Sequence, residues 1–548
     1  MIGRRKKRRR RPVMESCAQL TVYVRNRLQE YLEGTGAFQL PGKEREKFEL
    51  QIQQLRNALH CCMYGAGGEK EYVKYIILRM LEEMELTPSE RERLLPVNDP
   101  AYLSGKQKFD VLLFHYMKQY GKDAFLVLCD KWNLPKEVQR EDGGYFEITE
   151  EDIHEIFEKE RIDITGREQL ELIGDMVYEE FGHGVIDRLR DCRVDGISGG
   201  VAGVPEQFFR YEKELLGDYA GQHAYDSIFV MLRGNTVRLS FLSFGSEREL
   251  RRVVKALLRF ESPGELSCNR PYMVTDMKDG SRVFACRPPF SESWAFFVRK
   301  FDSAGEMTPE ELIKGDGAKT LIQALIIFVG SGLHIAVTGA QGSGKTTLLK
   351  ALVRFINPKY NLRIEESVFE LWMRREFPYR NILTFRETEN VDATEGLDAF
   401  RKTDGNCLMM GEIGTIQAAA LMIELSQVSE QQLFTHHAMT TEKLIGYFKN
   451  ALLRTGTYSD ERMAREQVTE AIDIHILCEK DIKGMRYIRE VAEITGAGEH
   501  DIRVLYRYNH REMRYEKVQT PSESLLRKME RQKDKKGIEE LHSFFVEV

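Results

Sequence analysis

The chain has 548 residues, of which 42% are hydrophobic and 30% are charged, a composition typical of water-soluble globular proteins. At about 150 residues per domain, this length predicts three to four domains. The formal net charge is −6, but eight basic residues stand in one run at 4–11, so the remaining residues carry 72 basic against 86 acidic side chains. With only 15 prolines and 43 glycines, collagen-like and low-complexity classes are excluded.

The sequence predicts neither a membrane span nor a secretory signal. Its longest apolar stretch, 321–329, ends at a Gly-Ser-Gly segment and is well short of the roughly 20 residues that a spanning helix needs. No apolar segment follows the basic run, as a signal peptide would require. The nine cysteines are scattered without a C-x-x-C pair, which favours reduced thiols and argues against a structural zinc site. We therefore expect a cytoplasmic protein.

The amino-terminal part of the chain is expected to be mainly helical. Residues 1–13 combine repelling charges with Pro12 and no apolar face, so we predict a disordered basic tail, and Met14 could be the true start. From 14 to 171, apolar residues recur at helical spacing. One helix should start at 149–152, where acidic residues favour the positive end of the helix dipole. This region shows no catalytic cluster, which favours a helical accessory domain.

Residues 172–310 show the mixed pattern of a smaller α/β domain. Two runs rich in β-branched and aromatic residues flank a turn at 233–236, which is typical of a hairpin. An amphipathic helix is expected over 247–260. Three further strands are expected at 272–274, 282–286 and 294–298.

The rest of the chain predicts a larger domain and a short appendage. Residues 311–499 include an apolar strand, 333–338, that runs directly into a glycine-rich turn and a helix. Residues 500–548 predict a strand pair followed by a charged helical tail. No internal repeat is evident.

The glycine-rich turn at 339–347 matches the phosphate-binding motif G-x-x-x-x-G-K-[ST]. Phosphates need several backbone N–H donors at short range, and glycines allow the left-handed path that brings these donors together. The following helix directs its positive end at the phosphates. We expect Lys345 to reach the β and γ phosphates and Thr346 to ligate Mg²⁺, so ATP and Mg²⁺ are the predicted ligands. The predicted nucleotide-binding residues are Gly339, Gly342, Ser343, Gly344, Lys345, Thr346 and Thr347.

Acidic and histidine residues follow apolar segments further downstream. The apolar run 406–412 ends in Glu412, as in a Walker B motif, where a carboxylate holds the Mg²⁺ shell or its water. Residues 363–371 predict a short strand that runs into acids. His436 and His437 follow another apolar run, a position where a histidine is more often structural than catalytic.

Taken in order, these motifs resemble those of the secretion ATPase superfamily of type II and type IV secretion and type IV pilus assembly. They are most similar to the CpaF-type ATPase of Flp/Tad pili. The family shows a Walker A motif, an acidic box, a Walker B motif ending in Gly-Glu and a histidine box, which here stand at 339–347, 364–371, 410–412 and 435–438. Shorter resemblances to its amino-terminal domain stand at 181–184, 279–283, 288–289 and 297–301. The resemblance covers about 175–480.

This resemblance implies a fold and a set of catalytic residues. The implied fold is α/β, with a RecA-like P-loop NTPase domain preceded by a smaller PAS-like α/β domain and an N-terminal helical domain. Glu365 holds the position of the catalytic glutamate that orients water, and Glu412 that of the Walker B acid, which with Thr346 holds the metal. His437 aligns with the histidine that senses the γ-phosphate region. Arg282 and Arg299 match arginines that neutralise developing charge.

The resemblance also implies partners and a location. We expect a homo-hexamer that works with an inner-membrane platform protein of a pilus or secretion system. Such an ATPase would be cytoplasmic and peripheral at the inner face of the cytoplasmic membrane. No specific nucleic-acid partner is expected, because the chain is acidic outside its tail and shows no base-stacking or helicase-like motif.

Departures from the family pattern and the basic tail each leave one alternative function open. The Asp after the box glutamate is Glu366 here, and Gly414 replaces the Arg that follows the Walker B motif. The segments 405–406 and 427–432 and the residue Met439 also differ. These changes motivate a nucleotide-gated scaffold with weak hydrolysis, whereas the basic tail motivates a nucleic-acid motor. The zinc-binding tetracysteine element of type II secretion is absent, which favours the CpaF-type branch.

Overall fold

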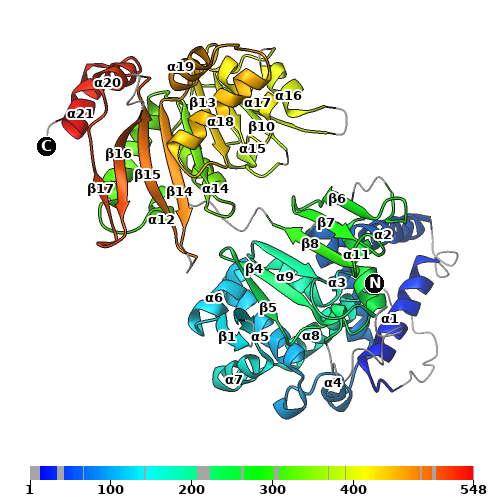
Figure 1. Cartoon of the computed structure of the whole chain (residues 1–548). Helices are drawn as coiled ribbons and strands as arrows, with labels where there is room; N and C mark the ends of the chain where they lie inside the picture. Colours follow the sequence, from blue (N-terminus) through cyan, green and yellow to red (C-terminus); the bar gives the residue numbers. More distant parts are fainter. Residues whose placement is uncertain are drawn as a thin grey trace. The chain divides into compact units, whose positions relative to one another are not determined.

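The structure is a computed structural model that consists of two compact units, Met1–Ser303 and Ala304–Val548, which we describe separately (Figure 1). It describes residues 13–33, 42–65, 67–140, 143–206, 222–260, 264–300, 308–367, 369–388, 391–400, 402–481, 484–496 and 502–546. Apart from Val13, the tail that we expected to be disordered lies outside these residues.

The first unit begins, as expected, with a mainly helical region. Its helix α7 starts after Thr149, whose side chain accepts a hydrogen bond from the N–H of Asp152, so the expected helix start is confirmed. Three more helices begin with the same reciprocal cap, at Thr87, Ser104 and Thr165. The helices are α1 (Cys17–Leu32), α2 (Gly42–Cys61), α3 (Gly67–Met84), α4 (Pro88–Leu94), α5 (Gly105–Tyr120), α6 (Ala124–Lys131), α7 (Glu150–Glu160), α8 (Gly166–Tyr178), α9 (Asp187–Asp191) and α11 (Glu247–Leu257).

A sheet of eight strands completes this unit, in the order β1-β2-β5-β4-β3-β8-β7-β6. Its strands are β1 (Lys136–Arg140), β2 (Gly143–Ile148), β3 (Gly196–Gly199), β4 (Ile228–Leu232), β5 (Asn235–Leu239), β6 (Tyr272–Asp276), β7 (Arg282–Cys286) and β8 (Ala295–Arg299). The expected hairpin is β4–β5, which turns through Arg233 and Gly234 with positive φ at both. The helical region also contains two strands that the sequence did not predict, β1 and β2, and β2 joins the sheet beside β5.

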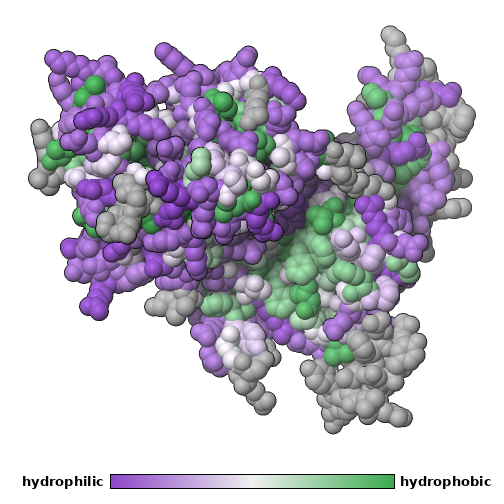
Figure 2. Space-filling model, turned by 45° about the horizontal axis from the view of Figure 1, so that its top comes forward, coloured by the Kyte–Doolittle hydropathy of each residue, from purple (hydrophilic) through white to green (hydrophobic). Residues whose placement is uncertain are grey.

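One hydrophobic core holds the helices and this sheet together. The buried cluster runs from Met14 to Val298 and includes helical and strand residues alike. At one contact, the ring of Phe109 on α5 lies 4.9 Å from that of Phe241, just after β5. Alternate residues on the sheet instead point outward, where Tyr272 and Phe297 are exposed. Figure 2 shows hydrophobic residues gathered in one area of an otherwise largely hydrophilic surface.

The second unit is built on a sheet of nine strands, in the order β11-β10-β12-β13-β9-β14-β15-β16-β17. The strands from β11 to β14 are parallel, and the last three are antiparallel. Their bounds are β9 (Ile335–Gly339), β10 (Leu362–Glu366), β11 (Ile382–Arg386), β12 (Cys407–Met410), β13 (Gln431–His436), β14 (Ile474–Lys480), β15 (Arg486–Ile494), β16 (Ile502–Asn509) and β17 (Arg514–Lys517).

Helices cover both faces of this sheet, because its parallel strands are buried on both sides. One core includes α13, α14, α20 and α21, and the other includes α16 to α19. The helices are α12 (Pro309–Leu312), α13 (Ala318–Gly330), α14 (Lys345–Leu352), α15 (Met373–Glu376), α16 (Ala393–Phe400), α17 (Ile416–Leu425), α18 (Thr441–Arg454), α19 (Glu461–Ala471), α20 (Glu523–Glu530) and α21 (Lys535–Phe545).

The carboxyl-terminal segment continues this second unit. The expected strand pair is β16 and β17, which extend the same sheet. Phe545 of α21 stacks on Phe328 of α13, with ring centroids 5.6 Å apart, so the helical tail packs into the core beside β9. Among the described residues, no helix combines the length and the apolar character needed to cross a bilayer. All nine cysteines are free thiols.

Candidate nucleotide-binding site

The P-loop connects β9 to α14 at the carboxyl edge of the parallel strands. Gly339, Gly342 and Gly344 have φ values of +146°, +74° and +92°, a region that favours glycine. At Gly339 an added Cβ would also meet the carbonyl oxygen of Cys478 at 2.1 Å, because β14 pairs with β9 at this point. Glycine at 339 is therefore required by the neighbouring strand as well as by the turn.

The charged and hydroxyl groups of this loop suit a bound phosphate. Lys345 is the first residue of α14, and its Nζ donates to the carbonyl oxygens of Gly339 at 3.0 Å and Ala340 at 3.1 Å. The buried hydroxyl of Ser343 has no partner among the described residues. A lysine ammonium, a helix amino terminus and the hydroxyl of Thr346 beside them are groups that bind nucleotide phosphates and Mg²⁺. The residues present thus fit both ATP and Mg²⁺.

One motif that is distant in sequence contacts this loop, and a second distant motif contacts the first. Nε2 of His437 lies 3.0 Å from Oε1 of Glu412, and both side chains are about half exposed, at 42% and 53%. On its other side, Nδ1 of His437 lies 3.2 Å from the carbonyl oxygen of Gly339 and 3.3 Å from Nζ of Lys345. The expected Walker B acid, histidine-box residue and P-loop lysine therefore form one connected cluster.

Glu365 lies near the carboxyl end of β10, the strand next to β12, with its carboxyl group buried. It is 1% exposed, and neither carboxyl oxygen has a hydrogen-bond partner among the described residues. Burial, followed by the negative charges of Glu387, Glu366 and Asp392, raises the pKa of this carboxyl to about 8. A Cβ at Gly396 would lie 2.1 Å from Oε2, so α16 passes directly over the acid.

Glu366, which stands where the family has Asp, has a structural contact instead. Its Oε1 accepts the backbone N–H groups of Glu370 at 3.0 Å and Leu371 at 2.9 Å. This fixes the loop that follows β10. Burial nevertheless raises the pKa of Glu366 to about 7, with the two backbone donors acting in the opposite direction.

The two predicted arginines lie in the first unit. Arg282 and Arg299 stand directly opposite each other on the paired strands β7 and β8. Arg299 is exposed and Arg282 is partly buried. The two arginines are thus neighbours across the β7–β8 pair. Their contact with a nucleotide stays a prediction.

Two residues near the P-loop were missed by sequence reasoning. Nε of Arg486 donates to the carbonyl oxygen of Gly342 at 2.9 Å, across 144 positions of sequence. The buried imidazole of His475 lies between the hydroxyl groups of Thr338 at 2.6 Å and Thr441 at 2.8 Å, and so joins β9 to the helix after the histidine box. No local pattern in the sequence indicates either contact, because each depends on where β14 and β15 pair.

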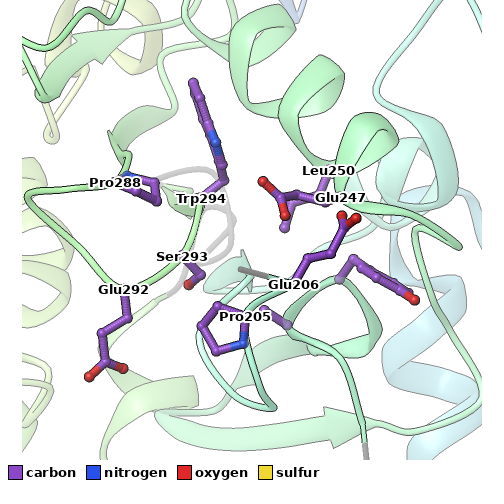
Figure 3. A pocket seen from close by; sticks show the side chains of 10 residues that line it. Pro205, Glu206, Glu247, Leu250, Pro288, Glu292, Ser293 and Trp294 are labelled. Atoms are coloured by element: carbon purple, nitrogen blue, oxygen red, sulfur yellow. The ribbon is translucent and has the colours of Figure 1, made fainter. Parts of the chain in front are cut away.

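The first unit also contains a small pocket whose lining includes none of the predicted site residues. Figure 3 shows Pro205, Pro288 and Trp294 at this pocket together with three glutamates, Glu206, Glu247 and Glu292. The guanidinium of Arg287 lies 5.2 Å from the Trp294 ring centroid. The P-loop, by contrast, lies in the second unit.

The sheet order, the P-loop and the acids beside it define a P-loop NTPase domain of the RecA-like type. Residues 315–451 match the family model described as "Type II/IV secretion system protein". This segment contains the Walker A motif, the acidic box, the Walker B motif and the histidine box. This segment of the second unit is thus similar to type II/IV secretion system proteins.

Solved structures of several secretion and pilus ATPases share a likeness at low sequence identity. The VirB11 ATPase from the Brucella suis type IV secretion system, in complex with sulphate, is 18% identical over 55% of this chain and 89% of that one, with a TM-score of 0.29. The Legionella pneumophila ATPase DotB is 13% identical over 64% and 82%, with a TM-score of 0.37. The pilus retraction motor PilT with bound ADP is 14% identical over 54% and 78%, with a TM-score of 0.36. No curated protein matches the sequence.

Proposed function

We propose that this chain is an ATP-hydrolysing motor that powers Flp/Tad-type pilus assembly or type II/IV protein secretion. The observation that carries the proposal is the contact of His437 with both Lys345 and Glu412, together with the buried Glu365 near the carboxyl end of β10 in the same sheet. The family match over 315–451 supports the same function. The motor would act as a homo-hexamer with an inner-membrane platform protein, peripheral at the inner face of the cytoplasmic membrane.

Each group at this edge has a role that its chemistry suits. Lys345 and the amino terminus of α14 would bind the phosphates, and Thr346 and Glu412 would hold Mg²⁺, which stabilises charge on the phosphate oxygens when bound. Glu365 would orient the attacking water. Because the pKa of the Glu365 carboxyl is raised to about 8, a nearby positive charge is required to deprotonate this carboxyl near neutral pH. His437 would report the state of the phosphates to Glu412 through their contact. Arg282 and Arg299 would supply charge from the first unit.

ATP turnover of matched variants tests the motor. We expect Lys345→Ala and Glu365→Gln each to lower turnover at least about 100-fold, with Lys345→Ala also weakening ATP binding. Lys536→Ala and Glu539→Gln on the exposed part of α21 are the matched controls and should leave turnover unchanged. Wild-type turnover in both Lys345→Ala and Glu365→Gln would refute the motor.

A second candidate is a nucleotide-gated scaffold of the same machinery with very slow hydrolysis. Two features favour it: Gly414 stands where the family has Arg, and burial raises the pKa of the Glu365 carboxyl to about 8. A Cβ at Gly414 would meet no atom within 4 Å, so a side chain fits there. The scaffold predicts that the wild type binds ATP and assembles with negligible turnover, and that Gly414→Arg raises turnover.

A further inference from the structure

We propose that Arg486 is an additional nucleotide-binding residue, which contacts the phosphates from the carboxyl-terminal hairpin of the same domain. The proposal rests on the nucleotide-binding function proposed above and adds a residue outside the four family motifs. Arg486 begins β15, far along the chain from the P-loop, and nothing in its local sequence suggests a ligand.

The pairing of strands brings Arg486 to the loop. Cys478 of β14 lies opposite Gly339, where the P-loop starts. Lys480, further along β14, lies opposite Arg486 of β15. The β14–β15 hairpin therefore extends beyond the carboxyl end of β9, at the edge where the phosphate-binding turn projects.

The side chain of Arg486 lies against the loop itself. Its Nε donates to the carbonyl oxygen of Gly342 at 2.9 Å. A Cβ at Gly344 would lie 3.4 Å from its Cδ, so the aliphatic stem covers Gly344. These two glycines precede Lys345, and the loop between them turns its backbone N–H groups toward a phosphate. The arginine thus holds the loop from the outside through its Nε and stem.

The terminal nitrogens of the guanidinium remain available for a ligand. Within the part of the chain that the structure describes, Arg486 makes the one hydrogen bond to Gly342 and no ion pair. A guanidinium carries five N–H donors, and its two terminal nitrogens can bind a phosphate in a bidentate manner. Arg489, three positions along the same strand, is instead occupied by Glu479, with Nη1 3.4 Å from Oε1.

Nucleotide binding by Arg486→Gln tests this inference, with Arg489→Gln as the matched control. We measure the dissociation constants of ATP and of inorganic tripolyphosphate, which lacks the nucleoside, together with the melting temperature without ligand. We expect Arg486→Gln to weaken both ligands by the same factor, about 10- to 100-fold, since a charge-assisted contact is lost. Arg489→Gln should bind both as the wild type does.

Two outcomes overturn the inference. One is an ATP affinity of Arg486→Gln within about twofold of the wild type, and the other is weakened ATP with unchanged tripolyphosphate, which would indicate a nucleoside contact. If the glutamine variant melts early, Arg486→Lys provides the same comparison, because lysine keeps the charge and loses the planar fork. Wild-type protein that fails to bind ATP refutes the proposed function itself, whereas normal wild-type binding with unaffected Arg486 variants refutes this inference alone.

Discussion

Glu412 and His437 contact each other directly, with 3.0 Å between Oε1 of the acid and Nε2 of the imidazole. The sequence separates them by a strand and a helix, and the parallel pairing of β12 with β13 brings them together. Because His437 also reaches the P-loop carbonyl of Gly339, a displacement of Glu412 can be transmitted to the loop through one side chain.

Breaking this contact should reduce turnover without unfolding the protein. We expect Glu412→Gln and His437→Asn each to lower ATP turnover about 10- to 100-fold, as for other groups that orient metal or phosphate ligands. Both side chains are about half exposed, so the melting temperature should hardly change. Turnover of the double variant should equal that of the worse single variant, and additive losses would contradict the coupling. His542→Asn, which breaks the His542–Glu530 pair on α21 and α20, is the control.

The buried carboxyl of Glu365 should make stability depend on pH. Its pKa is raised from 4.5 to about 8, so the folded state holds a proton that the unfolded state releases. The stability of the protonated form is complete below about pH 4.5 and is lost as the pH rises through 8. Glu365→Gln should therefore match the wild type at pH 4.5 and melt at a higher temperature at pH 8.5. Melting temperatures measured across this pH range check the prediction, with Glu539→Gln as the control. The same pH dependence for the wild type and Glu365→Gln would contradict it.

The buried imidazole of His475 should make the protein less stable as the pH falls, whereas Glu365 makes it less stable as the pH rises. Burial lowers its pKa from 6.5 to about 3, so its contribution is present above pH 6.5 and is lost as the pH falls through 3. We expect the stability of His475→Gln to fall less steeply than that of the wild type between pH 6.5 and 4. Because the imidazole bridges Thr338 and Thr441, the variant should also be less stable at pH 7. The exposed His510→Gln is the control, and identical slopes for His475→Gln and the wild type would refute the assignment.

The glycines of the P-loop should differ in their tolerance of a side chain. Gly339→Ala brings a Cβ to 2.1 Å from the carbonyl oxygen of Cys478, whereas a Cβ at Gly342 meets nothing within 4 Å. We expect Gly339→Ala to misfold or to lose ATP binding, and Gly342→Ala to cost about 1 to 2 kcal/mol for its left-handed backbone. Gly414→Ala, where φ is not positive and the space is open, should be neutral. Soluble yield, melting temperature and ATP binding are measured for the three variants. Equal values for Gly339→Ala and Gly342→Ala would contradict the steric argument.

Local patterns were sufficient for the P-loop and for the strand and helix around it. The apolar run before Gly339 and the Gly-Lys-Thr that follows are contiguous, so their geometry is set by nearby residues. The fold class of the domain follows from the same run of motifs, because each acid comes after a short apolar strand.

Contacts between distant segments could not be read from the sequence. The strand β1 has the sequence Lys-Glu-Val-Gln-Arg, which lacks an apolar face and becomes a strand by pairing with β2. The raised pKa of Glu365 depends on burial and on Glu387 and Asp392, whose proximity is set by β11 and the segment after it. The contacts of Arg486 and His475 could not be predicted for the same reason, because their partners are distant in the sequence.

The core that α5 and its neighbouring helices share with the first sheet limits where the chain could be divided. Phe109 lies in the region that the sequence predicts as helical and Phe241 in the predicted α/β domain, yet their ring centroids lie 4.9 Å apart. Recombination at residue 171 would leave one face of the sheet uncovered by its partner helices. The helices before residue 171 and the strands that they cover are therefore one cooperative unit rather than two separable domains.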